Sequence, residues 1–348
     1  MTYGLLFHPG HNRVYFDTSV ALSVSEFTIV SAKMPSHPEN IRLEEIEGLE
    51  FLLFDTADAM TVEDTDILCD LSFLYAIFEI TGEGSGRMMK PVRKTRVDFV
   101  DDSISQILKY TGKTNEIFTR MMINLAAYSL EDMPKNRPIR LLDPIAGKGT
   151  TLYEGLVKGY DVAGIEIGDT VVNEAFHYIK RFLETAKYKF EHDQTRISGP
   201  GKSFTALKHS FVIAPTKEDF KTKNVRCLDF TAGNALNAKH FYKKNHFDLI
   251  VGDLPYGVQH GNVTGEKQSS LTRNPSELLD ACLPVWKELM RQGGIIAMAW
   301  NVNVLDRYHA EKLFEKHGFE VLTEGEYSNF LHRVDQAIMR DIITARKV

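Results

Sequence analysis

The chain has 348 residues, of which 43% are hydrophobic and 25% are charged, a composition typical of one large globular domain plus a smaller one. No apolar run approaches the roughly 20 residues that span a bilayer, and the N-terminal residues lack a basic leader, so we expect a cytoplasmic protein without a membrane partner. Three widely separated cysteines without nearby histidine pairs indicate neither a disulfide framework nor a metal site.

The net charge of −6 conceals two oppositely charged parts. Residues 1–86 hold 3 basic and 15 acidic residues, whereas residues 87–348 hold 38 basic and 32 acidic residues. Binding of a phosphate backbone requires a local basic surface and not a basic total. One basic run is consistent either with phosphate contacts or with a charge run that offsets the acidic part, and it contains Arg87, Lys90, Arg93, Lys94 and Arg96.

Residues 1–86 carry short strand-like and helix-like runs, which predict a small α+β module. The strand-like runs are Gly4–Phe7, Val14–Phe16, Phe27–Ala32 and Glu50–Phe54, and the helix-like runs are Val20–Phe27 and Asp66–Phe78. Three glycines in Thr81–Gly86 predict a linker. We therefore expect the module at 1–86, a basic linker at 87–98 and a larger domain at 99–348.

Strands and helices alternate in the larger domain, which predicts a mostly parallel sheet with a late antiparallel strand. Helical periodicity covers Ser103–Leu130 in two segments divided near Gly112. Strands are expected at Ile139–Leu142, Asp161–Ile165, Val225–Phe230, Phe247–Val251, Gly294–Trp300, Glu320–Leu322 and Gln336–Thr344, and helices at Thr151–Lys158, Thr170–Tyr188, Leu278–Arg291 and Arg307–His317. The polar stretch Glu191–Lys208 is predicted to be a loop.

A glycine-rich turn follows the first strand of this domain and predicts a cofactor site. Gly147 and Gly149 let the backbone approach a ligand, and Asp143 stands at the strand end where the crevice of an open α/β sheet forms. Glu166 comes 19 residues after Gly147, as expected for an acid that binds a ribose diol. The turn lacks the first glycine of a Walker phosphate loop, and Leu152 replaces the third glycine of an NAD motif. S-adenosylmethionine, which has a ribose but no phosphates, fits better.

A third strand end usually supplies a polar group to the adenine of such a cofactor. The candidates here are Asp229 and Asn234. Counting back from the strand Phe247–Val251 favours Asn234, although Asp229 stays open.

A second motif, directly after the apolar strand Phe247–Val251, predicts an aromatic clamp for a planar amine. The nitrogen of such an amine is a poor nucleophile, so an enzyme must hold both N–H groups with acceptors and stack the base on a ring. The Asp253 carboxylate and the Leu254 carbonyl are the expected acceptors, Pro255 stiffens the turn and Tyr256 offers the stacking face.

With these motifs, Asp143-Pro-Ile-Ala-Gly-Lys-Gly-Thr150 and Asp253-Leu-Pro-Tyr-Gly257, the sequence resembles the RNA methylase family that includes tRNA guanine-N2 methyltransferases acting at position 10. The likeness covers about residues 100–348. It implies a Rossmann-like class I fold with a mostly parallel seven-stranded sheet and an antiparallel last strand. It also implies that the first module is related to ferredoxin-like and THUMP modules, for which RNA binding is a candidate role.

The resemblance further implies which residues bind the cofactor. A helix that begins near Asn115 and Phe118 is expected to cover the methionine end. The full implied set is Asp143, Ile145, Ala146, Gly147, Gly149, Thr150, Glu166, Ile167, Asn234, Asp229, Asn115 and Phe118.

The leading hypothesis is an S-adenosylmethionine-dependent N-methyltransferase acting on an exocyclic amine in RNA, with guanine N2 of tRNA as the most specific form. Methylation of adenine N6 or cytosine N4 in DNA is an alternative, as is methylation of a glutamine amide in a protein. A non-catalytic RNA-binding module that keeps the fold is a fourth reading.

Overall fold

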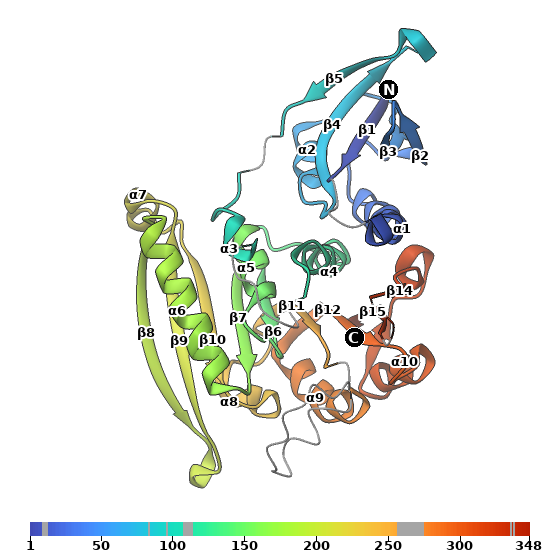
Figure 1. Cartoon of the computed structure of the whole chain (residues 1–348). Coiled ribbons are helices and arrows are strands. Elements are labelled where there is room, and N and C mark those ends of the chain that lie inside the picture. The colour runs from blue at the N-terminus through green and yellow to red at the C-terminus, as the bar shows by residue number, and fades with distance from the viewer. Residues whose placement is uncertain are drawn as a thin grey trace. The chain divides into compact units, whose positions relative to one another are not determined.

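The computed structural model describes residues 1–8, 13–82, 84–94, 97–106, 114–255, 275–334, 336 and 338–348. These residues form two compact units (Figure 1). The first unit contains Met1–Val97 and Glu324–Phe330, and the second contains Asp98–Thr323 and Leu331–Val348. None of the described helices is long and apolar enough to cross a membrane.

The first unit is built on an antiparallel sheet whose described strands follow the order β2-β3-β1-β4-β5. Its helix α2 starts with a capping box, in which Thr61 Oγ1 accepts the N–H of Asp64 and Asp64 Oδ2 accepts the N–H of Thr61. The strands are β1 (Thr2–Phe7), β2 (Glu39–Ile46), β3 (Leu49–Asp55), β4 (Leu74–Thr81) and β5 (Met88–Val92), and the helices are α1 (Arg13–Ser31) and α2 (Val62–Leu68).

A segment from much later in the chain completes this unit. Glu324–Phe330 contains the short 3₁₀ helix η5 (Gly325–Ser328), which contacts α1. Ser25 Oγ of α1 donates to Glu326 Oε2 at 2.8 Å. The fold of the first unit therefore depends on residues separated by about 300 positions in the sequence.

Three predictions for this module are wrong. Val14–Phe16 and nearly all of Phe27–Ala32 belong to α1 and not to strands. Their β-branched and aromatic residues mimic strands, but Val20, Phe27 and Val30 are buried at helical spacing. Asp66–Phe78 is not one helix, because α2 ends at Leu68 and the later residues pair with β1 as part of β4.

The predicted linker at 81–86 is instead the turn between β4 and β5. Gly82 and Gly84 have φ values of 75° and 51°, which glycine adopts without strain, and Thr81 pairs with Met88 across the hairpin. The unit therefore continues through β5, and the boundary falls after Val97 instead of at residue 86.

The second unit contains a sheet in the order β13-β15-β12-β11-β6-β7-β10-β9-β8, with β14 paired to β15. Neighbouring strands from β12 to β10 are parallel, whereas β15 runs antiparallel between β12 and β13. The predicted Rossmann-like fold with an antiparallel last strand is confirmed, but the sheet is mixed, because antiparallel strands flank its parallel centre on both sides. The strands are β6 (Arg140–Asp143), β7 (Asp161–Glu166), β8 (Lys189–Ser198), β9 (Thr205–Ala214), β10 (Arg226–Ala232), β11 (Phe247–Asp253), β12 (Met290–Asn301), β13 (Phe319–Val321), β14 (His332–Arg333) and β15 (Met339–Lys347).

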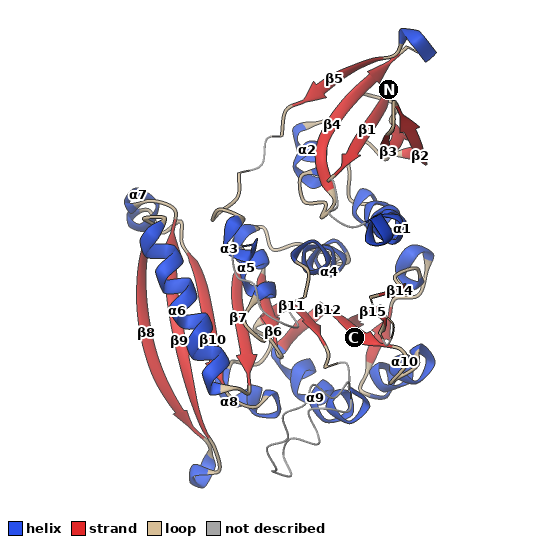
Figure 2. Cartoon of the chain, in the orientation of Figure 1, coloured by secondary structure: helices blue, strands red, loops and turns tan. Residues whose placement is uncertain are grey.

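Helices pack against this sheet and against one another (Figure 2). α4 contacts α5, and α6 contacts β7 and β10. α9 contacts α8 and α10, and its Trp286 belongs to the same buried cluster as Ile250 and Ile296 of the central strands. The helices are α3 (Ser103–Gln106), α4 (Glu116–Tyr128), α5 (Thr150–Val157), α6 (Asp169–Thr185), α7 (Lys217–Lys221), α8 (Ala238–Phe241) and α9 (Pro275–Leu289), with α10 (Arg307–Lys316) and the 3₁₀ helices η1 (Gly84–Gly86), η2 (Pro200–Lys202) and η3 (Ala235–Asn237).

The prediction of a loop at Glu191–Lys208 is wrong, because these residues form most of the hairpin β8–β9. β9 pairs with β10 and carries the buried residues His209, Phe211 and Ile213. β8 lies at the edge of the sheet and is mostly exposed, so its polar sequence hides the strand pattern. The hairpin adds two strands to the seven that were predicted.

Candidate active site

Four of the predicted site residues stand at or just beyond the carboxyl ends of neighbouring strands. Asp143 ends β6, Glu166 ends β7, Asn234 follows β10 and Asp253 ends β11. These strands are adjacent in the order β11-β6-β7-β10. Because parallel strands end at the same edge of a sheet, these side chains meet in the crevice where open α/β folds bind their ligands.

The turn after β6 has the backbone that its glycines predict. Gly147 and Gly149 have φ values of 53° and 93°, in the left-handed region that favours glycine. Ala146 N–H donates to the Ile165 carbonyl at 2.9 Å, which fixes the turn against β7. Thr150 then begins α5 and is buried. The turn thus brings backbone N–H groups to the strand ends.

Glu166 is held by this turn and by the chain that follows it. Gly147 N–H donates to Glu166 Oε2 at 3.2 Å, and Gly168 N–H donates to Oε1 at 2.8 Å. Burial raises the pKa of Glu166, although these backbone hydrogen bonds oppose the rise. Ile167 is 51% exposed beside it. The carboxylate is therefore oriented before any ligand arrives.

The donor set of this edge fits S-adenosylmethionine. A carboxylate at the end of β7 suits a ribose diol. Lys148 is the one cation inside the glycine turn. Its ammonium group forms an ion pair with Glu174 at 2.6 Å, so its charge is already paired with a carboxylate. A loop of this kind suits a nucleoside without phosphates better than a nucleotide.

Asp143 lies beneath the turn and is 3% exposed. Its Oδ1 accepts the N–H of Ile145 at 3.0 Å. Burial, with smaller contributions from the charges of Asp253 and Glu166, raises the pKa of Asp143 to about 7. Asp253 and Glu166 are therefore close enough to Asp143 for their charges to act on it, and negative charge at this edge favours a cationic ligand such as a sulfonium.

The two adenine candidates occupy different places. Asn234 follows β10, and its Oδ1 accepts the N–H of Leu236 at 2.9 Å. The preceding Gly233 N–H donates to the carbonyl of Glu166 at 2.9 Å, which ties this turn to β7. Asp229 instead lies inside β10 and forms an ion pair with Lys208 at 2.6 Å. Asn234 is thus at the crevice, and Asp229 is not.

The amine-clamp motif begins at the end of β11. Thr114 Oγ1 donates to Asp253 Oδ2 at 2.8 Å, and Leu254 N–H donates to the Ala299 carbonyl of β12 at 2.8 Å. Leu254 is 1% exposed, so its side chain anchors the motif and leaves recognition to its backbone. Pro255 is half-buried. Tyr256, the predicted stacking residue, lies outside the described residues.

The first turn of α4 adjoins this motif. Asn115 caps the helix, because its Oδ1 accepts the N–H groups of Ile117 at 2.8 Å and Phe118 at 3.3 Å. Phe118 is buried, and the Arg340 guanidinium lies 4.3 Å from its ring centroid. Neither Arg340 nor the role of Thr114 could be found in the sequence, because contacts across more than 100 positions leave no local signal.

The sequence and fold of this chain are similar to those of known methyltransferases. Residues 110–329 match the model of the RMKL-like methyltransferase domain, whereas no curated protein matches. A candidate RNA methyltransferase from Pyrococcus horikoshii is 15% identical, with a TM-score of 0.40 over 71% of this chain and 96% of that chain. An rRNA methylase from Streptococcus thermophilus is 12% identical, with a TM-score of 0.34 over 66% of this chain and 95% of that chain.

The sheet order and the edge residues define a class I methyltransferase with a Rossmann-like fold. The matched model spans more than half of the sequence, and the chain belongs to the RMKL-like methyltransferase family. This match confirms the resemblance found in the two motifs. The cofactor is S-adenosylmethionine, as predicted from Gly147, Gly149 and Glu166.

Proposed function

We propose that this protein transfers a methyl group from S-adenosylmethionine to the exocyclic amine of a base in RNA, and that guanine N2 of tRNA is its target. One observation carries the proposal: Asp253 stands at the carboxyl end of β11, two strands from Glu166, with its carboxylate oriented by Thr114. The amine acceptor and the ribose anchor thus share one crevice. The choice of RNA rests on the motif resemblance.

The proposed chemistry assigns a role to each edge residue. The cofactor supplies an electrophilic methyl group. Glu166 holds the ribose diol and Asn234 contacts the adenine. Asp253 and the Leu254 carbonyl each accept one N–H of the target amine, so its lone pair turns toward the methyl group. Tyr256 stacks on the base, and Pro255 stiffens the turn that carries it.

In this scheme the amine proton can be removed by a weak base. The amine becomes acidic once it is methylated, so the Asp253 carboxylate takes the proton without being a strong base. Asp143 has a different role, because it lies buried behind the Ile145 N–H and supports the turn.

The deciding experiment identifies the labelled product. The protein is incubated with tritiated S-adenosylmethionine and total tRNA, rRNA or genomic DNA, and the labelled nucleoside is identified by mass spectrometry. We expect N2-methylguanosine from tRNA. Label only in DNA or in protein would overturn the proposal.

Replacement of Asp253 tests the clamp itself. We expect Asp253→Ala to abolish methyl transfer while cofactor affinity, measured by calorimetry, stays nearly unchanged. Asp193→Ala, which removes an exposed carboxylate of β8, is the matched control and should keep full activity. Full turnover by Asp253→Ala would remove Asp253 from the mechanism.

A further inference from the structure

The hairpin β8–β9 brings its turn to the same sheet edge as the candidate active site. The pairing registers place Arg196 of β8, Leu207 of β9, Ala232 of β10 and Glu166 of β7 in one row across the sheet. Three strand spacings separate Arg196 from Glu166, or about 14 Å. The hairpin turn after Ser198 extends beyond this row (Figure 1).

The hairpin turn has a defined structure. Gly199 N–H donates to the Phe204 carbonyl at 3.0 Å, and Lys202 N–H donates to the Gly199 carbonyl at 2.9 Å. A Cβ at Gly199 would lie 2.4 Å from the Phe204 ring, so this position requires glycine. The Phe204 ring in turn contacts the rings of His240 and Phe241 in α8. The turn and α8 therefore form one surface.

The sequence around this surface is poor in carboxylates, and Asp193 is the one nearest in sequence to Arg196. Residues 194–217 and 230–247 contain no Asp or Glu. We give the name tip cluster to three exposed cations of this surface: Arg196, Lys202 and Lys239. None of them forms an ion pair with a described residue. Glu288 of α9 is close enough to Lys239 for their charges to interact, but its ion pair is with Lys244. The acidic Glu166 and Asp169 lie two strands away from β9, at the end of β7. The tip cluster is thus a local basic surface in an acidic protein.

Several other cations of the second unit are paired with carboxylates. Lys208 forms an ion pair with Asp229 at 2.6 Å, and Lys316 forms one with Asp280 at 2.7 Å. Arg307 contacts Asp341 at 2.8 Å. Cations that are already paired contribute less to phosphate binding, because the anion must displace their partner.

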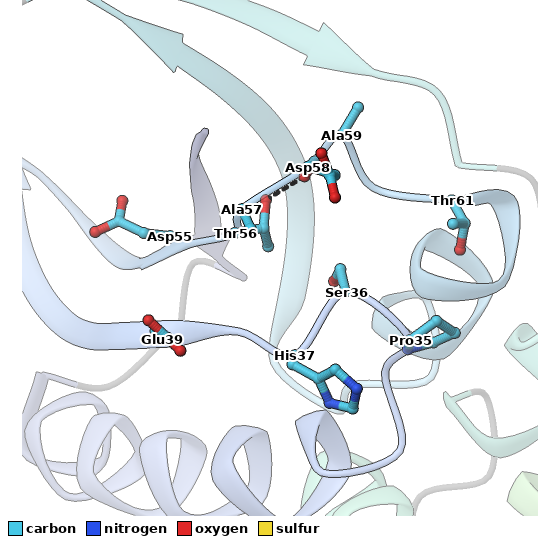
Figure 3. Close-up of a pocket in the computed structure, with 10 residues that line it drawn as sticks. All are labelled: Pro35, Ser36, His37, Glu39, Asp55, Thr56, Ala57, Asp58, Ala59 and Thr61. Atoms are coloured by element: carbon cyan, nitrogen blue, oxygen red, sulfur yellow. Dashed lines mark hydrogen bonds between the residues drawn. The ribbon is translucent and has the colours of Figure 1, made fainter.

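The first unit is a less favourable surface for binding phosphate than the tip cluster. Arg87 pairs with Glu44 at 2.6 Å and Lys90 with Glu79 at 3.5 Å, so part of the basic run offsets the acids of its own unit. A cavity in this unit, about 500 Å³ in volume, is lined by Glu39, Asp55 and Asp58 among other residues (Figure 3). Their negative charge repels phosphate.

We propose that the tip cluster binds the phosphate backbone of the RNA substrate. The inference rests on the proposed function. Five strand spacings separate β8 from β11, or about 24 Å. A stacked strand rising about 3.4 Å per nucleotide covers this distance in roughly seven nucleotides. The contacts are made to the backbone, so they fix the register of the RNA and leave base selection to the clamp.

The test measures RNA affinity as a function of salt for the full chain. The probe is a fluorescent oligouridylate of about 12 nucleotides, which has no target base and reports backbone binding alone. Each single-strand phosphate contact contributes about 0.7 to the slope of log affinity against log salt. For the triple variant Arg196→Ala, Lys202→Ala, Lys239→Ala we expect the slope to flatten by about 2 and the affinity at about 0.1 M salt to fall roughly 100-fold.

A matched triple variant controls for charge. Lys187→Ala, Lys217→Ala, Lys223→Ala removes three exposed lysines at the opposite end of the same hairpin and should leave the slope unchanged. Cofactor affinity should match the wild type in both variants, which shows that both are folded. Equal slopes for the tip variant and the wild type, or equal losses in the two variants, would overturn the proposal.

Failure of this proposal can be told apart from failure of the proposed function. If the wild type methylates RNA and the tip variant keeps its salt slope, the tip proposal falls and the function stands. If the wild type labels only DNA or protein, the proposed function falls first and the tip proposal falls with it.

Discussion

At the residue scale, Asp253 depends on a partner from a distant part of the chain. Its Oδ2 accepts a hydrogen bond from Thr114, 139 positions earlier, immediately before the Asn115 cap of α4. The start of α4 therefore sets the direction of the carboxylate. Thr114 acts through Asp253 and is a positioning residue.

We expect Thr114→Val to lower kcat for methyl transfer roughly tenfold, the effect of a lost hydrogen bond worth about 1.4 kcal/mol. Cofactor affinity should stay the same, because Asp253 is assigned to the amine. Thr114→Ser, which keeps the hydroxyl group, should restore kcat. Steady-state assays with saturating RNA check this. If Ser fails to rescue, or if Val lowers cofactor affinity instead, Thr114 has only a structural role.

Residues whose role is local could be found in the sequence, and residues whose role is long-range could not. Gly147 and Gly149 were recognisable because a turn between strand and helix needs their φ values, and Glu166 because its distance from the turn is fixed by one βαβ unit. Thr114 and Arg340 gain their roles only when distant segments meet.

At the element scale, a buried carboxylate joins the opposite, amino ends of the parallel strands. Asp248, near the start of β11, is fully buried. Its oxygens accept two hydrogen bonds from Arg137, at 2.6 and 2.8 Å, and one from Arg291 at 2.6 Å. Arg140 N–H of β6 donates to it at 2.8 Å. Burial alone would raise the pKa of Asp248, but these hydrogen bonds and charges lower it.

We expect Asp248→Asn to lower the free energy of unfolding by about 2 to 3 kcal/mol at neutral pH, because two partly exposed arginines lose hydrogen bonds to a charged partner. A lowered folded-state pKa stabilises the fold above the unfolded pKa, and this contribution disappears as the pH falls through the folded pKa. The difference between variant and wild type should therefore shrink below about pH 4. Urea unfolding measured across pH checks both points.

Asp280→Asn is the control for that measurement. Asp280 is 43% exposed at its side chain and pairs with Lys316, so its loss should change stability far less than the loss of Asp248 does. Equal destabilisation by the two variants would contradict a special role for Asp248.

A strand that is buried on both faces of the sheet could be predicted from the sequence, whereas a strand with an exposed face could not. β11 was recognisable because its residues 247–252 are all buried and, apart from Asp248, all apolar. β8 was missed because an edge strand needs no apolar residues on its solvent side. α1 was divided into strands because its apolar residues fit both periods over short windows.

At the scale of the whole molecule, the cofactor should stabilise one unit and not the other. Glu166 and Asn234 belong to the second unit, whereas the sheet around β1 belongs to the first. With cofactor at about 100 times its Kd, we expect slowly exchanging amides of β6 and β7 to gain up to about 2.7 kcal/mol of protection. Amides of β1 and β4 should not change. Hydrogen exchange by mass spectrometry checks this.

Glu166→Ala provides the control, since the same cofactor concentration should then give little protection. Equal gains in both units of the wild type would show that they unfold as one cooperative body.

The late return of the chain to the first unit has a consequence for synthesis on the ribosome. Residues 1–97 emerge first, but Glu324–Phe330 completes their unit only after about 230 more residues have been made. At about 5 to 20 residues per second, the nascent first unit waits roughly 10 to 45 seconds for η5. During that time the α1 surface that η5 will cover is open, so the newborn chain passes through a stage at which chaperones can hold it and proteases can cut it.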